Sequence, residues 1–242
     1  MAADQTPPNT NLTDGVALSE PVVLSLPPQW PGAFKAYKYS KQAVKLNANA
    51  IVGWIIISVL VSGAISTLGR SYNSGAPTRG LFEVISYIIA PLFSAIITKA
   101  LIASVRRQPV SVGQAFSQGW PYWLNTIVLS ILVGVTLLVS LLLLIIPFFF
   151  VWPRLSLATY FLVDKNLGPL EAYKASWEAT KGYAGFIYGI LGAEVAMGLL
   201  AITIIGIPFA IYFLIMYSAS HALLYEVITS STARSVKTPV EA

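Results

Sequence analysis

The sequence contains no cysteine and a single histidine, His221. Without cysteine there is no disulfide, no thiolate metal site and no cysteine nucleophile. One imidazole is too few for a zinc site built from two or three histidines. We therefore expect no metal site and no cofactor.

Charged residues are also scarce. Of 242 residues, 10% are charged and 56% are hydrophobic, and the mean hydropathy is +0.71. Because a soluble domain is about a quarter charged, this chain has too little polar surface to cover a globule in water. The composition predicts an integral membrane protein. The net charge of +5 is then explained by basic anchors at the membrane surface, and we expect no nucleic-acid partner.

Catalytic signatures are missing as well. The chain has no G-x-S-x-G elbow, no H-E-x-x-H zinc motif and no phosphate-binding G-x-x-x-x-G-K-[ST] loop. Its acidic residues are scattered rather than paired for acid/base work. We expect a protein that is not an enzyme.

Six apolar runs are candidates to span a hydrocarbon core of ~30 Å, which takes ~20 helical residues. They cover residues 50–68, 81–101, 123–146, 148–163, 183–204 and 207–227. The fourth run is short and contains Pro153, which could leave it partly re-entrant. The loops after the third and fifth runs have only a few residues, which favours tight antiparallel hairpins. The predicted fold class is an all-α integral membrane protein with six transmembrane helices as three hairpins, each preceded by an interfacial amphipathic helix.

The chain outside these runs predicts two tails. Residues 1–30 are rich in proline and have little periodicity, and they lack the basic region and long apolar run of a signal peptide. We interpret them as a disordered cytoplasmic tail, residues 31–228 as the membrane domain and residues 229–242 as a cytoplasmic C-terminal tail.

An internal repeat divides the membrane domain. Residues 36–51 align with residues 172–187 through eight identical pairs: Ala36/Ala172, Tyr37/Tyr173, Lys38/Lys174, Ser40/Ser176, Ala43/Ala179, Lys45/Lys181, Ala48/Ala184 and Ile51/Ile187. A weaker third copy covers residues 115–123. The pattern predicts three units, at about 33–105, 112–164 and 168–228, each an entry helix followed by a hairpin.

The entry helices carry lysine on one side. At 100° per residue the lysines of the first copy share one arc, and those of the second keep this arrangement. The candidate lipid-headgroup contacts are Lys35, Lys38, Lys41, Lys45, Lys174 and Lys181. One interpretation is recruitment of anionic lipid; the other is that the lysines only fix topology and solvate the helix. Lysine and arginine gather at one end of the runs, which predicts a multi-pass plasma-membrane protein with both termini cytoplasmic.

Two ionisable residues fall well inside the apolar runs, where charge is costly. At 1.5 Å per residue, Arg154 lies ~10 Å and Glu194 ~13 Å below the outer boundary, so we predict that they face each other. They form either part of a solute, ion or proton pathway or a structural ion pair between hairpins. His221 is better explained as a packed, hydrogen-bonding residue than as a proton sensor.

Several short motifs carry a family resemblance. They are Pro147, Arg154–Ala158 (RLSLA), Val163–Pro169 (VDKNLGP) and Ala172–Trp177 (AYKASW). From about residue 31 to 227 the chain resembles a group of uncharacterised prokaryotic polytopic membrane proteins related to the membrane domain of some glycerophosphoryl diester phosphodiesterases. The resemblance implies six spans. It supplies no functional residue, and the phosphodiesterase activity is not carried over.

Two functions fit these features. The first is a non-enzymatic membrane scaffold or accessory subunit, with the bilayer, anionic lipids and other membrane proteins as partners. The alternative is a small-solute or lipid permease with Arg154 and Glu194 lining its pathway. A water-filled cavity that reaches Arg154 would favour the permease, and a closed bundle with an apolar outer groove would favour the scaffold.

Overall fold

A computed structural model describes residues 29–71, 75–143, 145–199, 202 and 206–237, and over these residues the chain is helical with no strand. The helices are α1 (Ala33–Leu46), α2 (Ala48–Ser71), α3 (Gly75–Val105), α4 (Val112–Gly119), the short 3₁₀ helix η1 (Trp120–Tyr122), α5 (Trp123–Leu143), α6 (Ile145–Leu155), α7 (Ala158–Lys165), α8 (Pro169–Ala179), α9 (Ala184–Leu199), α10 (Gly206–Tyr217) and α11 (Ser220–Lys237). The all-α prediction is confirmed for this part of the chain. Most of the predicted N-terminal tail lies outside the described residues.

Four helical segments are long and apolar enough to cross a membrane. They are Ala48–Ser71, Gly80–Val105, Val112–Leu143 and Gly206–Ser230. A fifth is added if α8 and α9, which meet at a bend of 98°, count as one span. The chain is therefore a membrane-embedded, polytopic helical protein, and the count of six spans stays a prediction.

The fourth apolar run is interrupted, but not where the sequence suggested. We expected the break at Pro153, yet α6 continues through this proline to Leu155. The break lies at the next two residues, where the hydroxyl of Ser156 donates to the carbonyl of Pro153 at 2.9 Å. The interruption leaves α6 with 11 residues.

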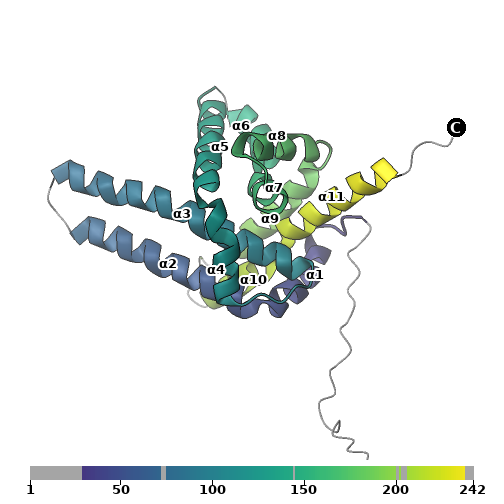
Figure 1. Ribbon diagram of the computed structural model, residues 1–242, viewed down its shortest axis with the longest axis horizontal. Coiled ribbons are helices and arrows are strands. Elements are labelled where there is room, and N and C mark those ends of the chain that lie inside the picture. Colours follow the sequence, from purple (N-terminus) through teal and green to yellow (C-terminus); the bar gives the residue numbers. More distant parts are fainter. Residues whose placement is uncertain (1–28, 72–74, 144, 200–201, 203–205, 238–242) are drawn as a thin grey trace, which may run out of the picture.

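The first hairpin stands apart from the other helices. Figure 1 shows α2 and α3 side by side, extending away from the rest, while α5 leaves in another direction. The buried residues of α2 are Ala50, Ile51 and Trp54, all in its first two turns. The rest of α2 therefore offers an apolar surface to whatever surrounds the protein.

Three helices, α1, α4 and α8, which we call the entry helices, each precede a longer apolar helix. Their N-caps are Gly32, Ser111 and Gly168. Four and eight positions after each N-cap stands a small residue that is fully buried or nearly so: Ala36 and Ser40, Ala115 and Gly119, Ala172 and Ser176. Small side chains on one face allow a neighbouring backbone to approach closely. These faces set how the entry helices pack.

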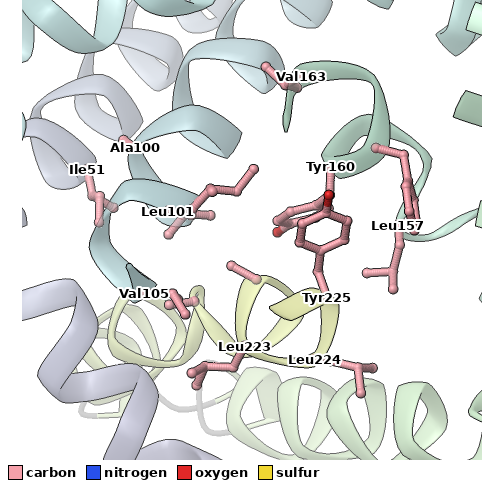
Figure 2. Close-up of a cluster of buried hydrophobic side chains, with 14 of the residues drawn as sticks. Ile51, Ala100, Leu101, Val105, Leu157, Tyr160, Val163, Leu223, Leu224 and Tyr225 are labelled. Carbon is pink, nitrogen blue, oxygen red and sulfur yellow. The ribbon is translucent and has the colours of Figure 1, made fainter. Parts of the chain in front are cut away.

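The core lies where the ends of α3, α7 and α11 converge (Figure 2). The rings of Tyr160 and Tyr225 stack with centroids 5.8 Å apart, and Phe161 meets Tyr225 edge-on at 5.0 Å. Around them lie Leu101, Leu157 and Leu224, all buried. This packing holds three helix ends from distant parts of the chain at one place. The last of them, α11, continues to Lys237, so residues 229–237, predicted as part of a tail, extend this helix.

Candidate functional site

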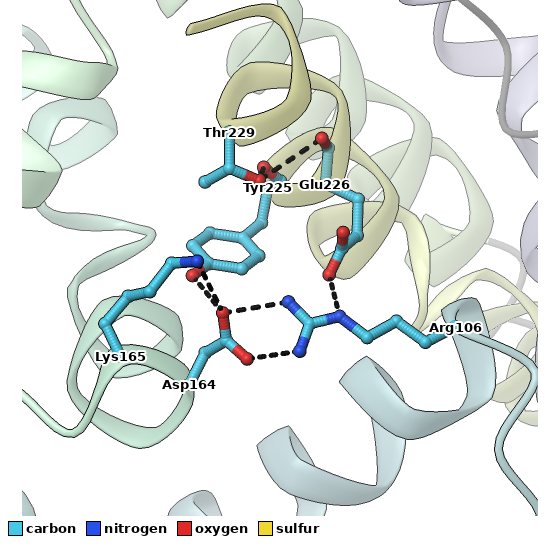
Figure 3. Close-up of polar contacts among 6 residues, drawn as sticks. All are labelled: Arg106, Asp164, Lys165, Tyr225, Glu226 and Thr229. Atoms are coloured by element: carbon cyan, nitrogen blue, oxygen red, sulfur yellow. Dashed lines mark hydrogen bonds and ion pairs between the residues drawn. The ribbon is translucent and has the colours of Figure 1, made fainter. Parts of the chain in front are cut away.

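Polar side chains from the ends of α3 and α7 meet two residues within α11, in a group that we call the Arg106 cluster: Arg106, Asp164, Lys165, Tyr225 and Glu226 (Figure 3). The two terminal nitrogens of Arg106 donate to the two carboxylate oxygens of Asp164 at 2.5 and 2.8 Å. Its Nε donates to Oε1 of Glu226 at 2.6 Å. The guanidinium therefore joins one acid from α7 to one acid from α11.

Asp164 has further partners. The hydroxyl of Tyr225 donates to its Oδ2 at 2.6 Å, and the ammonium of Lys165 lies 3.6 Å from the same oxygen. The side chain of Asp164 is only 6% exposed, whereas that of Arg106 is 33% exposed. A buried carboxylate is tolerated when its lone pairs are occupied in this way.

The cluster favours the charged forms of Asp164 and Arg106. Burial would raise the pKa of Asp164, but the hydrogen bonds from Arg106 and Tyr225, together with the positive charges of Arg106 and Lys165, hold it below its usual range. The hydrogen bond to Asp164 raises the pKa of Arg106 further above its ordinary value. With two cations facing two carboxylates, the charges balance. Such a group is suited to holding helices together.

Sequence reasoning missed this cluster. We interpreted the basic residues after the second and fourth apolar runs as membrane-side anchors. A signal was present in the sequence. Arg106, Asp164 and Glu226 stand at or just after the C-terminal ends of the second, fourth and sixth apolar runs. Opposite charges at one membrane face can pair, and the three helix ends bring them together.

The predicted pair of Arg154 and Glu194 is not formed. In the described chain Oε1 of Glu194 lies 3.6 Å from Nδ1 of His221, while Nη1 of Arg154 is buried and has no hydrogen-bond partner there. The depth estimate assumed straight, unbroken helices. The fourth run instead breaks after Leu155, and α9 follows a bend of 98°, so equal counts along the chain do not give equal positions in space.

The backbone of Arg154 nevertheless connects two helices. Its carbonyl accepts hydrogen bonds from the hydroxyls of Ser176 at 2.7 Å and Thr180 at 3.3 Å. A helix has unsatisfied carbonyls in its last turn, and α8 supplies the donors for this one. The entry helix α8 is thereby attached to the end of α6.

The six lysines predicted as headgroup contacts are spread over α1, α8 and the turn that follows α8. Lys35, Lys38, Lys45, Lys174 and Lys181 are exposed, and Lys181 donates to Glu178 at 2.6 Å. Lys41 differs, because its ammonium lies 5.8 Å from the ring centres of both Tyr37 and Tyr212. Two aromatic faces thus hold one cation against α10.

Two cavities open on the surface. One, of about 360 Å³, is an apolar groove between α1, α9 and α10. Its walls include Ala33, Phe34, Tyr37, Ala196, Met197 and Phe213. The other, of about 290 Å³, lies between α2 and α3 beside Arg70 and Glu83. Neither of these two is lined by Arg154 or Glu194.

The described residues contain no group of three or more acidic or histidine side chains that could hold a metal ion. The comparisons with known proteins add no assignment: no family model, no curated protein and no solved structure matches this chain. The family resemblance drawn from the short motifs therefore stays a prediction.

Proposed function

We propose that the protein is a non-enzymatic membrane scaffold or accessory subunit, which binds other membrane proteins through the outer faces of its hairpins. The observation that carries this proposal is the contrast between the charge-balanced Arg106 cluster and the exposed apolar surface of α2. The Arg106 cluster balances its own charges, whereas α2 beyond Trp54 is apolar and unburied over several turns. Exposed apolar faces in a membrane serve lipid or partner helices.

We further propose that the body is built from three related units in cyclic order, with each entry helix packed on the preceding unit. Two contacts at equivalent positions support this. A Cβ added to Gly53 in α2 would lie 3.6 Å from Val112, the first residue of α4; one added to Gly189 in α9 would lie 3.4 Å from Ala33, the first residue of α1. Gly53 and Gly189 follow the aligned stretches 36–51 and 172–187 by the same two residues.

The second arms support the same order. Ser40 of α1 donates to the carbonyl of Met216 in α10 at 2.7 Å, as Ser176 of α8 does to Arg154 in α6. In α4 the equivalent residue is Gly119, where a Cβ would come within 2.6 Å of the Cα of Ile96 in α3. Each entry helix thus rests on the second arm of the unit before it, and α1 rests on the last unit.

The breaks in two second arms are also alike. Ser218, between α10 and α11, donates to the carbonyl three residues before it at 2.7 Å, as Ser156 does between α6 and α7. Eight residues after each serine comes an acid, Glu226 or Asp164, and both acids bind Arg106. In this proposal the three second arms end together on the cytoplasmic side. The proposal includes six spans in the plasma membrane and cytoplasmic termini.

The scaffold proposal can be tested by photo-crosslinking in cells. A crosslinking amino acid is placed at Val59 or Leu60, which are 64% and 65% exposed on α2, and at the buried Ile51 as a control. We expect discrete protein adducts at the two outer positions and none at position 51. Adducts to lipid alone at positions along α2 and α5 would refute a scaffold that acts through these faces.

One observation favours the permease as a second candidate, namely the buried Nη1 of Arg154 without a partner in the described chain. Because the chain has no cysteine, Arg154→Cys and Glu194→Cys can each be probed in intact cells with a membrane-impermeant thiol reagent. Labelling of both in folded protein would indicate an aqueous path and favour transport. Protection of both would favour the scaffold.

A further inference from the structure

The groove between α1, α9 and α10 is an apolar cavity that opens on the surface. Its volume of about 360 Å³ falls within the range of small-molecule sites, ~300–1,000 Å³. The hydroxyl of Tyr217 donates to the carbonyl of Ala33 at 2.9 Å, which fixes the start of α1 against α10. The ring of Tyr37 packs on that of Phe213 at 5.6 Å and completes the wall. The groove is thus a feature held by contacts between elements.

A cation stands beside this wall. The ammonium of Lys41 lies 5.8 Å from the centre of the Tyr37 ring, which lines the groove, and equally far from that of Tyr212. Cation–π contacts at this distance favour one position for an otherwise flexible side chain. Apolar walls and a fixed positive charge therefore occur together.

The charges of the entry helices single out α1. It contains four lysines and no acidic residue. The entry helix α8 carries Glu171 and Glu178 beside Lys174, and Glu178 also neutralises Lys181. An anion is attracted to α1 far more than to α8, although the two helices share a motif.

We propose that the groove binds one acyl chain of an anionic phospholipid, whose phosphate is bound by Lys41. The acyl chain lies against the apolar side chains of Phe34, Met197 and Phe213. The headgroup lies toward the lysine face of α1. This assignment requires only that the protein is embedded in a membrane. It holds whether the protein is a scaffold or a permease.

The test is lipid photo-crosslinking on the purified full-length protein in nanodiscs of equal phosphatidylglycerol and phosphatidylcholine. p-Benzoylphenylalanine replaces Phe34 at the groove, which is 86% exposed, or Phe150 on α6, which is 70% exposed, as the matched control. We expect phosphatidylglycerol adducts to exceed phosphatidylcholine adducts about fivefold at position 34, the factor that corresponds to ~1 kcal/mol per basic residue. At position 150 we expect the bulk ratio.

Two substitutions locate the site. Lys41→Gln should return the ratio at position 34 to that of the bulk, while Lys174→Gln on α8 should leave it unchanged. Ala196→Trp, at an exposed position in the groove wall, should lower the total lipid adducts at position 34 in protein that still elutes as one species. Equal amounts of the two lipids at position 34 in the unsubstituted background would overturn the proposal. Adducts there to residues 1–28 or to a second copy of the chain would equally overturn it.

Discussion

Removing the carboxylate of Asp164 should destabilise the protein by about 3 kcal/mol. Asp164 accepts two hydrogen bonds from Arg106 and one from Tyr225, and hydrogen bonds to charged groups contribute ~1.5–3 kcal/mol each. The side chain of Arg106 is one-third exposed and keeps its bond to Glu226, so water and the second acid recover part of the loss. For Asp164→Ala we therefore expect a cost at the lower end of the ~3–5 kcal/mol seen when one partner of a buried pair is removed.

A double-mutant cycle separates the pair from its surroundings. Asp164→Asn, Arg106→Gln and the double variant are unfolded reversibly in mixed micelles and followed by circular dichroism. We expect a coupling free energy of at least ~1.5 kcal/mol, whereas Glu178→Gln, which breaks an exposed pair with Lys181, should cost under ~0.5 kcal/mol. A coupling below ~0.5 kcal/mol would refute the view that the cluster fastens the helix ends.

Three further outcomes follow from the same structure. The pKa of Asp164 is lower in the folded than in the unfolded protein, so its contribution to the free energy of unfolding is fully present above the unfolded value of ~3.9 and is lost as pH falls through the folded pKa. The difference in stability between the unsubstituted protein and Asp164→Asn should therefore be constant from pH 5 to 8 and shrink below pH 4. Gly119→Ala, whose Cβ would come within 2.6 Å of the α3 backbone, should cost ~1–3 kcal/mol in the same unfolding assay, while Gly134→Ala, with open space around it, should not destabilise. Ser40→Ala and Ser176→Ala should each cost ~1 kcal/mol, and a neutral result for both would contradict the proposed docking role of these serines.

Composition and periodicity predicted the class of the fold because both depend on properties of the chain itself, namely its charge content and its apolar runs. Too few charges for a water-exposed surface and runs of about 20 apolar residues lead directly to helices in a membrane. The first entry helix, placed by the aligned stretch 36–51, and the apolar run that follows it were visible for the same reason. The small residues Ala36 and Ser40, noted in the repeat, prove to be buried.

The features that were missed depend on contacts between distant segments. The helix breaks after Leu155, two residues beyond the proline that marked the break in the sequence. Arg106 meets acids that lie 58 and 120 positions further along the chain, and no periodic pattern links such positions. The pairing of Arg154 with Glu194 failed because depth along a helix was counted without knowing where each helix bends.

A charged cluster at the point where helices meet also specifies their pairing more narrowly than an apolar contact does. In the proposed arrangement three similar units meet at one end. If leucine stood at the positions of Arg106, Asp164 and Glu226, the units would pack almost as well in a different order. The junction instead joins Arg106 of the first unit to one acid from each of the other two, while Lys165 lies beside the acid of its own unit. Arg106 alone contacts both acids, so the two later units do not complete the junction without the first. Buried ionic groups of this kind often add little net stability, and here their contribution lies in specifying which helix ends belong together.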